Sequence, residues 1–203
     1  VYLGRALQTV NPPNASVGSA QIADSLISGK TALGATPADT DELLISDAGI
    51  LKRVDYSYLK SANTPAFLVS NTGNNTGKTD NAYSKMTYNV ETFDTDSAFD
   101  ISNNKFTVPT GEGGKYFFSV TEFLVGDSAG CVDSWVNLYK NGSNAVGQNG
   151  NDFDFSNYSP TFSAVLDLSA GDYIEVYCKV NVSSGTWGQY AGGIWQGFKL
   201  IGV

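Results

Sequence analysis

Histidine is absent from all 203 residues of the chain, so any chemistry must come from carboxylates, amides, hydroxyls and aromatic rings. Nucleophile triads and most zinc sites depend on histidine as a general base or as a metal ligand. Two pairs of acidic residues have the alternating spacing of candidate catalytic carboxylates, Asp94 with Asp96 and Asp152 with Asp154. Both pairs lie in turn-like sequence, where acidic side chains usually hold the turn or face water. The sequence therefore predicts a protein that is not an enzyme.

Calcium binding is the metal chemistry that the acidic residues suit best, through Asp127, Asp133, Asp152 and Asp154. Hard cations bind several oxygens from carboxylates, amides and backbone carbonyls, and Asn151–Asp154 supplies such oxygens at loop spacing. The fixed glycine and the distal glutamate of a full calcium loop are missing. A solvated acidic loop is therefore the favoured interpretation, calcium stays open as the alternative, and no other cofactor is expected.

Five aromatic residues fall in turn-rich segments rather than in strand-like sequence: Phe153, Phe155, Tyr158, Trp187 and Tyr190. Aromatic rings anchor interfaces and present apolar faces to ligands, while neighbouring Asp and Asn side chains can bond hydroxyl groups. We predict a receptor-binding role for these five residues, with packing in the core or in an oligomer interface as an equally weighted alternative. Trp135 and Trp195 lie within strand-like sequence and are predicted to be core residues.

The two cysteines, Cys131 and Cys178, do not have the spacing of metal ligands. A disulfide between them is one interpretation. Two free, partly buried thiols are the favoured one, because a free cysteine behaves as a small apolar residue.

The charge balance excludes several partners. The chain has a net charge of −8, and its 12 basic residues form no run, so a nucleic-acid partner is not expected. An acidic chain gains nothing from an anionic membrane surface, and no long apolar run predicts membrane insertion. The N-terminus lacks a basic-then-apolar signal segment, which suggests a processing cut, a fragment, or a route other than secretion.

From residue 63 onward, short strand-like segments alternate with turn clusters rich in Gly, Asn and Asp. The segments are Phe67–Ser70, Tyr83–Val90, Lys105–Val108, Tyr116–Val125, Ser134–Lys140, Thr161–Leu168, Tyr173–Val180 and Ile194–Val203. Scarce charge, 22 glycines and many aromatics suit tight turns and sheet packing. Residues 63–203 are therefore predicted to form an all-β sandwich or jelly roll.

Residues 1–62 have few large apolar side chains and are predicted to form an appendage to this head. Residues 1–40 read as an extended attachment or linker segment, which is too poor in apolar groups to bury a core alone. Residues 41–62 read as a neck, in which Glu42–Ser46 and Ile50–Val54 flank a three-residue loop and form a bulged β-hairpin. Asp55 is expected to cap a short helix over Tyr56–Ser61. The neck is either a simple linker or a trimer-forming element.

Six segments of the head, in order, resemble the jelly-roll heads of complement component 1q and the tumour necrosis factor superfamily. The segments are Pro65–Phe67, Asn103–Pro109, Gly114–Ser119, Leu138–Gly142, Leu166–Val176 and Ile194–Leu200. The resemblance implies a ten-stranded jelly roll, a homotrimer and a binding rather than a catalytic role. It also implies that the loops 126–133, 149–160 and 182–193 lie at the far tip, and that the turns 141–144 and 169–172 lie at the base.

Three segments in the first 62 residues, Ser16–Ser25, Gly29–Gly34 and Asp41–Asp55, are similar to phrases of bacteriophage tail-fibre and virion proteins. This similarity implies a virion fibre whose residues 1–62 attach to other virion proteins and whose trimeric head adsorbs to a host cell-surface receptor. A glycan is one candidate receptor. The alternative is a structural head-fibre or decoration protein with no specific receptor. A fibre-borne depolymerase is disfavoured by the missing histidine.

Overall fold

The computed structural model describes residues 28–59, 63–126, 130–150 and 157–201. The chain divides into two compact units, Val1–Lys60 and Ser61–Val203. In the described part of the chain, no helix has the length and apolarity that crossing a membrane requires.

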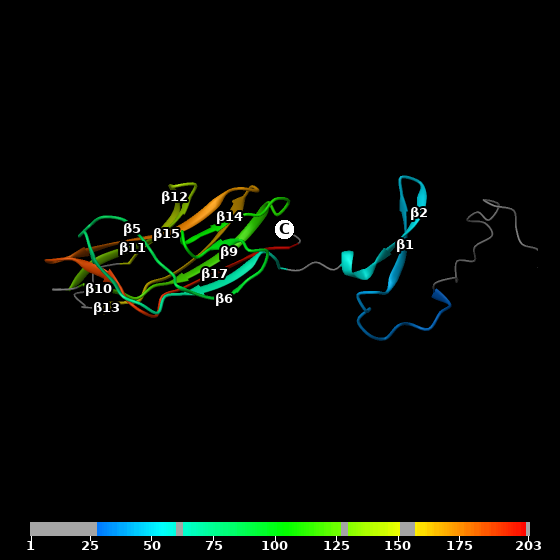
Figure 1. Ribbon diagram of the computed structural model, residues 1–203, viewed down its shortest axis with the longest axis horizontal. Helices are drawn as coiled ribbons and strands as arrows, with labels where there is room; N and C mark the ends of the chain where they lie inside the picture. Colours follow the sequence, from blue (N-terminus) through cyan, green and yellow to red (C-terminus); the bar gives the residue numbers. More distant parts are fainter. Residues whose placement is uncertain (1–27, 60–62, 127–129, 151–156, 202–203) are drawn as a thin grey trace, which may run out of the picture. The chain divides into compact units, whose positions relative to one another are not determined.

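The first unit contains the expected β-hairpin, whose strands are β1 (Glu42–Asp47) and β2 (Ile50–Asp55) (Figure 1). The strands pair without a break from Glu42 opposite Asp55 to Asp47 opposite Ile50. The connection is therefore the two-residue loop Ala48–Gly49, and the predicted three-residue bulged loop is wrong. Both loop residues have positive φ, 49° and 83°, as in the primed turns whose twist matches that of paired strands.

The helix expected over residues 56–61 is only a single 3-10 turn, Tyr56–Tyr58. Asp55 occupies the N-cap position, but its side chain makes no capping hydrogen bond, so this part of the prediction is wrong. The turn buries none of its residues. Without a packed face, a helix this short has nothing to offset the cost of nucleation.

The head is built on an antiparallel five-stranded sheet. Its order is β14 (Thr161–Leu168), β9 (Gly114–Thr121), β17 (Ile194–Lys199), β3 (Ala66–Ser70) and β6 (Val90–Asp94). Side chains alternate between the two faces of each strand, so Tyr116, Phe118 and Val120 of β9 point inward and are buried.

The opposing sheet has six strands. Its order is β12 (Ser143–Gly150), β11 (Cys131–Lys140), β15 (Tyr173–Val182), β8 (Lys105–Thr107) and β7 (Phe99–Asp100), with β5 (Ser84–Lys85) also paired to β15. The expected all-β jelly-roll sandwich is confirmed, and its two main sheets hold eleven strands where ten were expected.

A third sheet of four short strands, which we call the distal sheet, extends the first. Its order is β13 (Asn157–Tyr158), β10 (Leu124–Gly126), β16 (Trp187–Gln189) and β4 (Asn75–Lys78). Along the chain β13 precedes β14, β10 follows β9, β16 precedes β17 and β4 follows β3. The distal sheet therefore repeats the order of four strands of the five-stranded sheet, β14, β9, β17 and β3, beyond an interruption in each of them.

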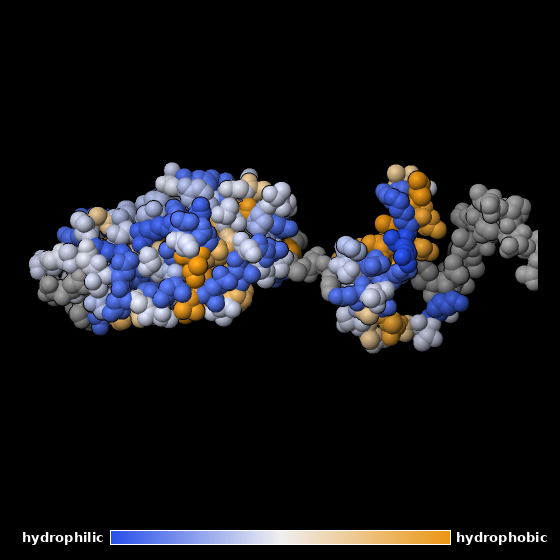
Figure 2. Space-filling view, viewed as in Figure 1, coloured by the Kyte–Doolittle hydropathy of each residue, from blue (hydrophilic) through white to orange (hydrophobic). Residues whose placement is uncertain are grey.

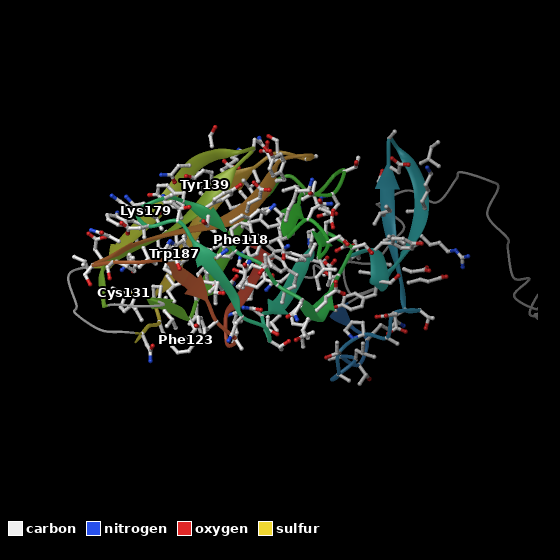
Figure 3. The ribbon with its side chains drawn as sticks, turned by 60° about the vertical axis from the view of Figure 1, so that its left-hand side comes forward. Phe118, Phe123, Cys131, Tyr139, Lys179 and Trp187 are labelled. Atoms are coloured by element: carbon white, nitrogen blue, oxygen red, sulfur yellow. The ribbon has the colours of Figure 1, made fainter. Side chains whose placement is uncertain are left out.

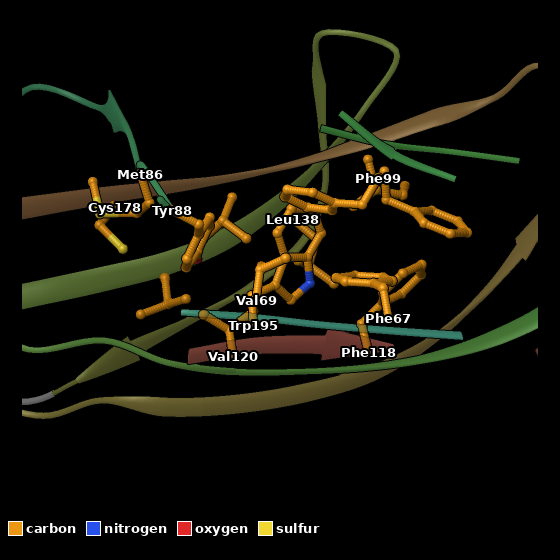
Figure 4. Packing of buried hydrophobic residues seen from close by; sticks show 14 of the residues in the cluster. Phe67, Val69, Met86, Tyr88, Phe99, Phe118, Val120, Leu138, Cys178 and Trp195 are labelled. Atoms are coloured by element: carbon orange, nitrogen blue, oxygen red, sulfur yellow. The ribbon is translucent and has the colours of Figure 1, made fainter. Parts of the chain in front are cut away.

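The core between the sheets is aromatic (Figure 4). The ring of Phe67 lies 5.1 Å, between centroids, from each of Phe99, Phe106 and Trp195. Burying one large apolar side chain of this kind contributes about 2–3 kcal/mol to stability. Trp195 is fully buried, as predicted.

Two further predictions about single residues have different outcomes. Trp135 was expected in the core but lies on the outer face of β11, because its inward neighbours along the strand are Ser134 and Val136. Cys131 and Cys178 are buried free thiols, as favoured from the sequence.

Candidate functional site

The distal sheet is where the sequence placed the receptor-binding aromatics. It joins β10, β13 and β16, so segments of all three predicted tip loops lie side by side. At the opposite turns, the Asn141 Nδ2 donates to Asp172 Oδ1 over 2.7 Å, which holds the two predicted base turns together.

Trp187 does not face solvent. Its segment, expected to be a loop, is the strand β16, and its side chain is fully buried with Nε1 donating to the Thr79 carbonyl over 2.8 Å. A buried indole cannot touch a receptor, so the prediction of a binding role for Trp187 is wrong, and the packing alternative holds.

The other four aromatics divide into two groups. Tyr190 and Tyr158 are partly exposed at the distal sheet, where Tyr190 packs edge-on against Phe123 with centroids 6.3 Å apart. Phe153 and Phe155 lie outside the described residues. A tip site built on Tyr158 and Tyr190 therefore stays a prediction.

Of the four aspartates predicted to bind calcium, only Asp133 is among the described residues. Asp133 lies on β11, and its Oδ1 is buried with no hydrogen-bond partner in the described part of the head. Asp127, Asp152 and Asp154 lie outside the described residues. Within the described residues, no group of three acidic or cysteine side chains is placed to hold a metal. Calcium stays a prediction. Asp94, in contrast, holds a turn as expected, because its carboxylate accepts from the backbone amides of Ala98 and Phe99.

A buried polar cluster lies where the distal sheet joins the five-stranded sheet. The carboxylate of Glu122, between β9 and β10, accepts hydrogen bonds from the Tyr88 hydroxyl and, over 2.9 Å, from Gln189 Nε2. The Gln189 Oε1 in turn accepts from the Thr87 amide over 2.9 Å. Glu122, Tyr88 and Gln189 are all buried. Sequence reasoning missed the cluster because its residues come from distant segments and form no local pattern.

Burial raises the pKa of Glu122 to about 7, against the lowering effects of the hydrogen bonds from Tyr88 and Gln189 and of the nearby Lys78 ammonium. The pKa of the Tyr88 hydroxyl is raised by burial and by the same carboxyl group. Gly193 makes room for the cluster, because a Cβ there would come within 2.6 Å of the Glu122 Oε2. The Glu122 carboxyl group thus keeps its proton up to about pH 7, at a closely packed junction between two sheets.

The outer face of the five-stranded sheet carries a row of apolar side chains beside polar ones, and sequence reasoning missed this row too. Strand register places Phe198 beside Phe117 and Phe117 beside Val165, with Leu68 beside Phe93 at the next pair of strands. The ring centroids of Phe117 and Phe198 are 5.4 Å apart. Together with Ile194, we call these six residues the association face: Leu68, Phe93, Phe117, Val165, Ile194 and Phe198.

The most exposed members of the association face are Val165 at 53%, Phe93 at 47% and Ile194 at 42%. In Figure 2 a short apolar stripe lies on the head over the region of β17 and β6. Antiparallel sheets usually place polar residues on a face that meets water. Exposed apolar groups on a sheet face are common where proteins contact one another. The signal was present in the sequence as adjacent Phe117 and Phe118, which must point to opposite faces of one strand.

The comparisons with known proteins show the fold of this head. No protein-family model matches the chain, and no curated protein sequence does. Among solved structures, Eiger TNF from S. frugiperda is 12% identical with a TM-score of 0.51, covering 68% of this chain and 93% of that one. Murine APRIL is 10% identical with a TM-score of 0.50, covering 66% and 98%. The head has a jelly-roll fold of the tumour necrosis factor type.

The globular domain of zebrafish complement 1qA is also similar, at 18% identity and a TM-score of 0.47, covering 68% of this chain and 98% of that one. The two tumour necrosis factor-type structures confirm the part of the sequence resemblance that concerns the fold. At these identities the likeness concerns the fold alone.

Proposed function

We propose that this chain is a non-catalytic binding protein whose head assembles into a homotrimer through the association face. The observation that carries the proposal is the row of exposed apolar side chains on a sheet face that the single chain leaves uncovered. A closed cyclic assembly covers such a face in every copy, and three-fold symmetry is what the sequence resemblance implies.

The light-scattering mass of the native particle tests this proposal. Three chains are expected for the wild type, and one chain for the variants V165D and F93D, which place a charge on exposed residues of the association face. The matched control is V132D, since Val132 is also exposed, at 37%, but lies on the opposing sheet. A monomeric wild type, or equal loss of assembly in V132D, would refute the association face.

The finer proposal is a virion fibre, found in the assembled particle and made in the host cytoplasm. Residues 1–62 attach the chain to other virion proteins, and the trimeric head adsorbs to a host surface receptor. The phage-like phrases in residues 1–62 support this origin. The hairpin also supports a partner for this unit, because Leu44, Ile50 and Leu51 are 62–73% exposed on a two-stranded sheet that is marginal alone.

Adsorption separates this proposal from the structural alternative, a head-fibre or decoration protein without a receptor. The burial of Trp187 and the packing of Tyr190 favour the alternative at the tip. The variant Y158A/Y190A should abolish adsorption to host cells while the trimer mass stays unchanged. Unchanged adsorption would leave the distal sheet without a receptor role.

A further inference from the structure

An aromatic patch lies on the outer face of the six-stranded sheet, opposite the association face. Strand β11 contributes Trp135 and Tyr139, and β15 contributes Tyr177. Tyr83, in the loop before β5, packs edge-on against Tyr139. The ring centroids of Tyr139 and Tyr177 are 4.2 Å apart, and those of Tyr83 and Tyr139 are 6.0 Å apart. These four residues, which we call the aromatic patch, are all partly or fully exposed.

A lysine, Lys179, lies on this patch with its ammonium against aromatic rings. The Lys179 Nζ is 3.6 Å from the ring centroid of Trp135 and 5.4 Å from that of Tyr83. In the described part of the head, no acidic side chain lies within ion-pair distance of this ammonium. The neighbouring Glu175 is already paired with Lys85. Figure 3 labels Tyr139 and Lys179 in the head. In a chain with a net charge of −8, an ammonium whose contacts among the described residues are with aromatic rings is open to an anion from outside.

The patch is held from beneath by a buried amide. Asn137, only 3% exposed, donates through Nδ2 to the Tyr83 hydroxyl over 3.3 Å. Its Oδ1 is buried and has no hydrogen-bond partner in the described part of the head. Gly147, opposite Asn137 on β12, leaves the space for this amide, because a Cβ there would lie 2.2 Å from Asn137 Oδ1. Buried polar atoms usually have a hydrogen-bond partner, so the unpartnered Oδ1 sets this amide apart from an ordinary one.

We propose that the aromatic patch with Lys179 binds an acidic saccharide, a sugar ring that carries a carboxylate. The apolar face of the ring packs on Tyr139 and Tyr177, its hydroxyls bond the tyrosine hydroxyls, and its carboxylate pairs with the Lys179 ammonium. A nucleic acid does not fit, since one free lysine cannot offset the repulsion between a polyanion and an acidic chain.

This inference rests on the proposal that the head is a binding module, and it places a ligand away from the distal sheet. The association face and the aromatic patch lie on opposite outer faces of the sandwich, so assembly through the former leaves the latter open. Three weak sites on one particle would act together on a polymeric glycan.

Tryptophan fluorescence of the full chain reads this site directly. Trp187 and Trp195 are fully buried, so a ligand on the patch changes the emission of Trp135. We expect α-1,4-linked trigalacturonate, or a sialylated trisaccharide, to give a saturable change, and W135F to lose it. The methyl ester of trigalacturonate keeps the rings and removes the charge, and it should bind at least about tenfold more weakly.

K179Q should also weaken trigalacturonate binding about tenfold or more. The control is K115Q, because Lys115 is a lysine exposed on the opposite sheet, and this variant should leave binding unchanged. Melting temperatures check that both variants fold. The inference is overturned if neither acidic saccharide binds, if the ester binds equally well, or if K115Q has the effect of K179Q. If the protein is a monomer and still binds an acidic saccharide, only the homotrimer proposal is overturned. If it is a trimer and binds neither saccharide, only the saccharide proposal is overturned.

Discussion

Glu122 is a carboxyl group that the fold keeps fully buried, so its proton is coupled to folding. Its folded pKa of about 7 lies above the ordinary value of 4.5, which means that the folded chain keeps a proton that the unfolded chain releases. This contribution to stability is complete below about pH 4.5 and is lost as the pH rises to and through 7. Ionisation therefore costs the folded state of the order of 3 kcal/mol.

We expect the substitution E122Q to flatten this dependence, because a glutamine carries no proton to lose. Between about pH 4.5 and 8 the wild type should lose roughly 5–10 °C of melting temperature that E122Q keeps. Differential scanning calorimetry across this range measures the difference. The control is E91Q on β6, where the side chain is exposed. If E91Q and E122Q have the same pH profile, Glu122 is not the group responsible.

Gly193 is a second residue whose role follows from the same cluster. G193A should destabilise the head by roughly 1–3 kcal/mol, because its Cβ would overlap the Glu122 carboxylate at 2.6 Å. G73A is the matched control, since its Cβ would meet only Asn71 Oδ1, at 3.9 Å. Urea unfolding measures both, and equal midpoints would show that the junction can relax around an added methyl group.

At the scale of elements, the hairpin loop gives a test of backbone geometry alone. Nothing lies within 4 Å of a Cβ placed at Gly49, so G49A should cost about 1–2 kcal/mol through left-handed strain only. A48G should have the opposite sign, because Ala48 already adopts a φ of 49°. Hydrogen exchange of the β1 and β2 amides measures both changes. Faster exchange in A48G would contradict the turn assignment.

The elements that the sequence predicted best are those whose pattern is local. The strands of the head alternate apolar and polar residues, and the hairpin has a glycine at its turn. The loop length was wrong because Asp47, a turn-forming residue type, pairs with Ile50 as the last residue of β1. Strand β16 was missed because its three residues become a strand only by pairing with β10 and β4, which are distant in sequence.

The same reason explains which site residues were placed correctly. The sequence brought the segments of the distal sheet together through a family resemblance, but it could not tell a buried Trp187 from an exposed one. Burial there depends on Thr79 and on strands far along the chain. The association face, Glu122 and the aromatic patch likewise depend on register between distant strands, which periodicity within one strand does not reveal.

At the scale of the whole molecule, the two outer faces of the sandwich have different characters. One is the association face, and the other has aromatic rings, Lys179 and the Lys85–Glu175 pair. A head that assembles through the first face should have a melting temperature that rises with protein concentration, because association stabilises the folded state by mass action. V165D should melt at a temperature independent of concentration. Calorimetry over a hundredfold dilution series tests this, and a wild type without such dependence would argue for a head that stays monomeric.

The distal sheet keeps the order of four strands of the sheet that it extends, although each of the four is interrupted between the two. The register of the sandwich is fixed by its own longer pairings, so the distal strands can change in length without shifting it. A protein engineer could use the same property to transplant a foreign recognition loop between β10 and β11.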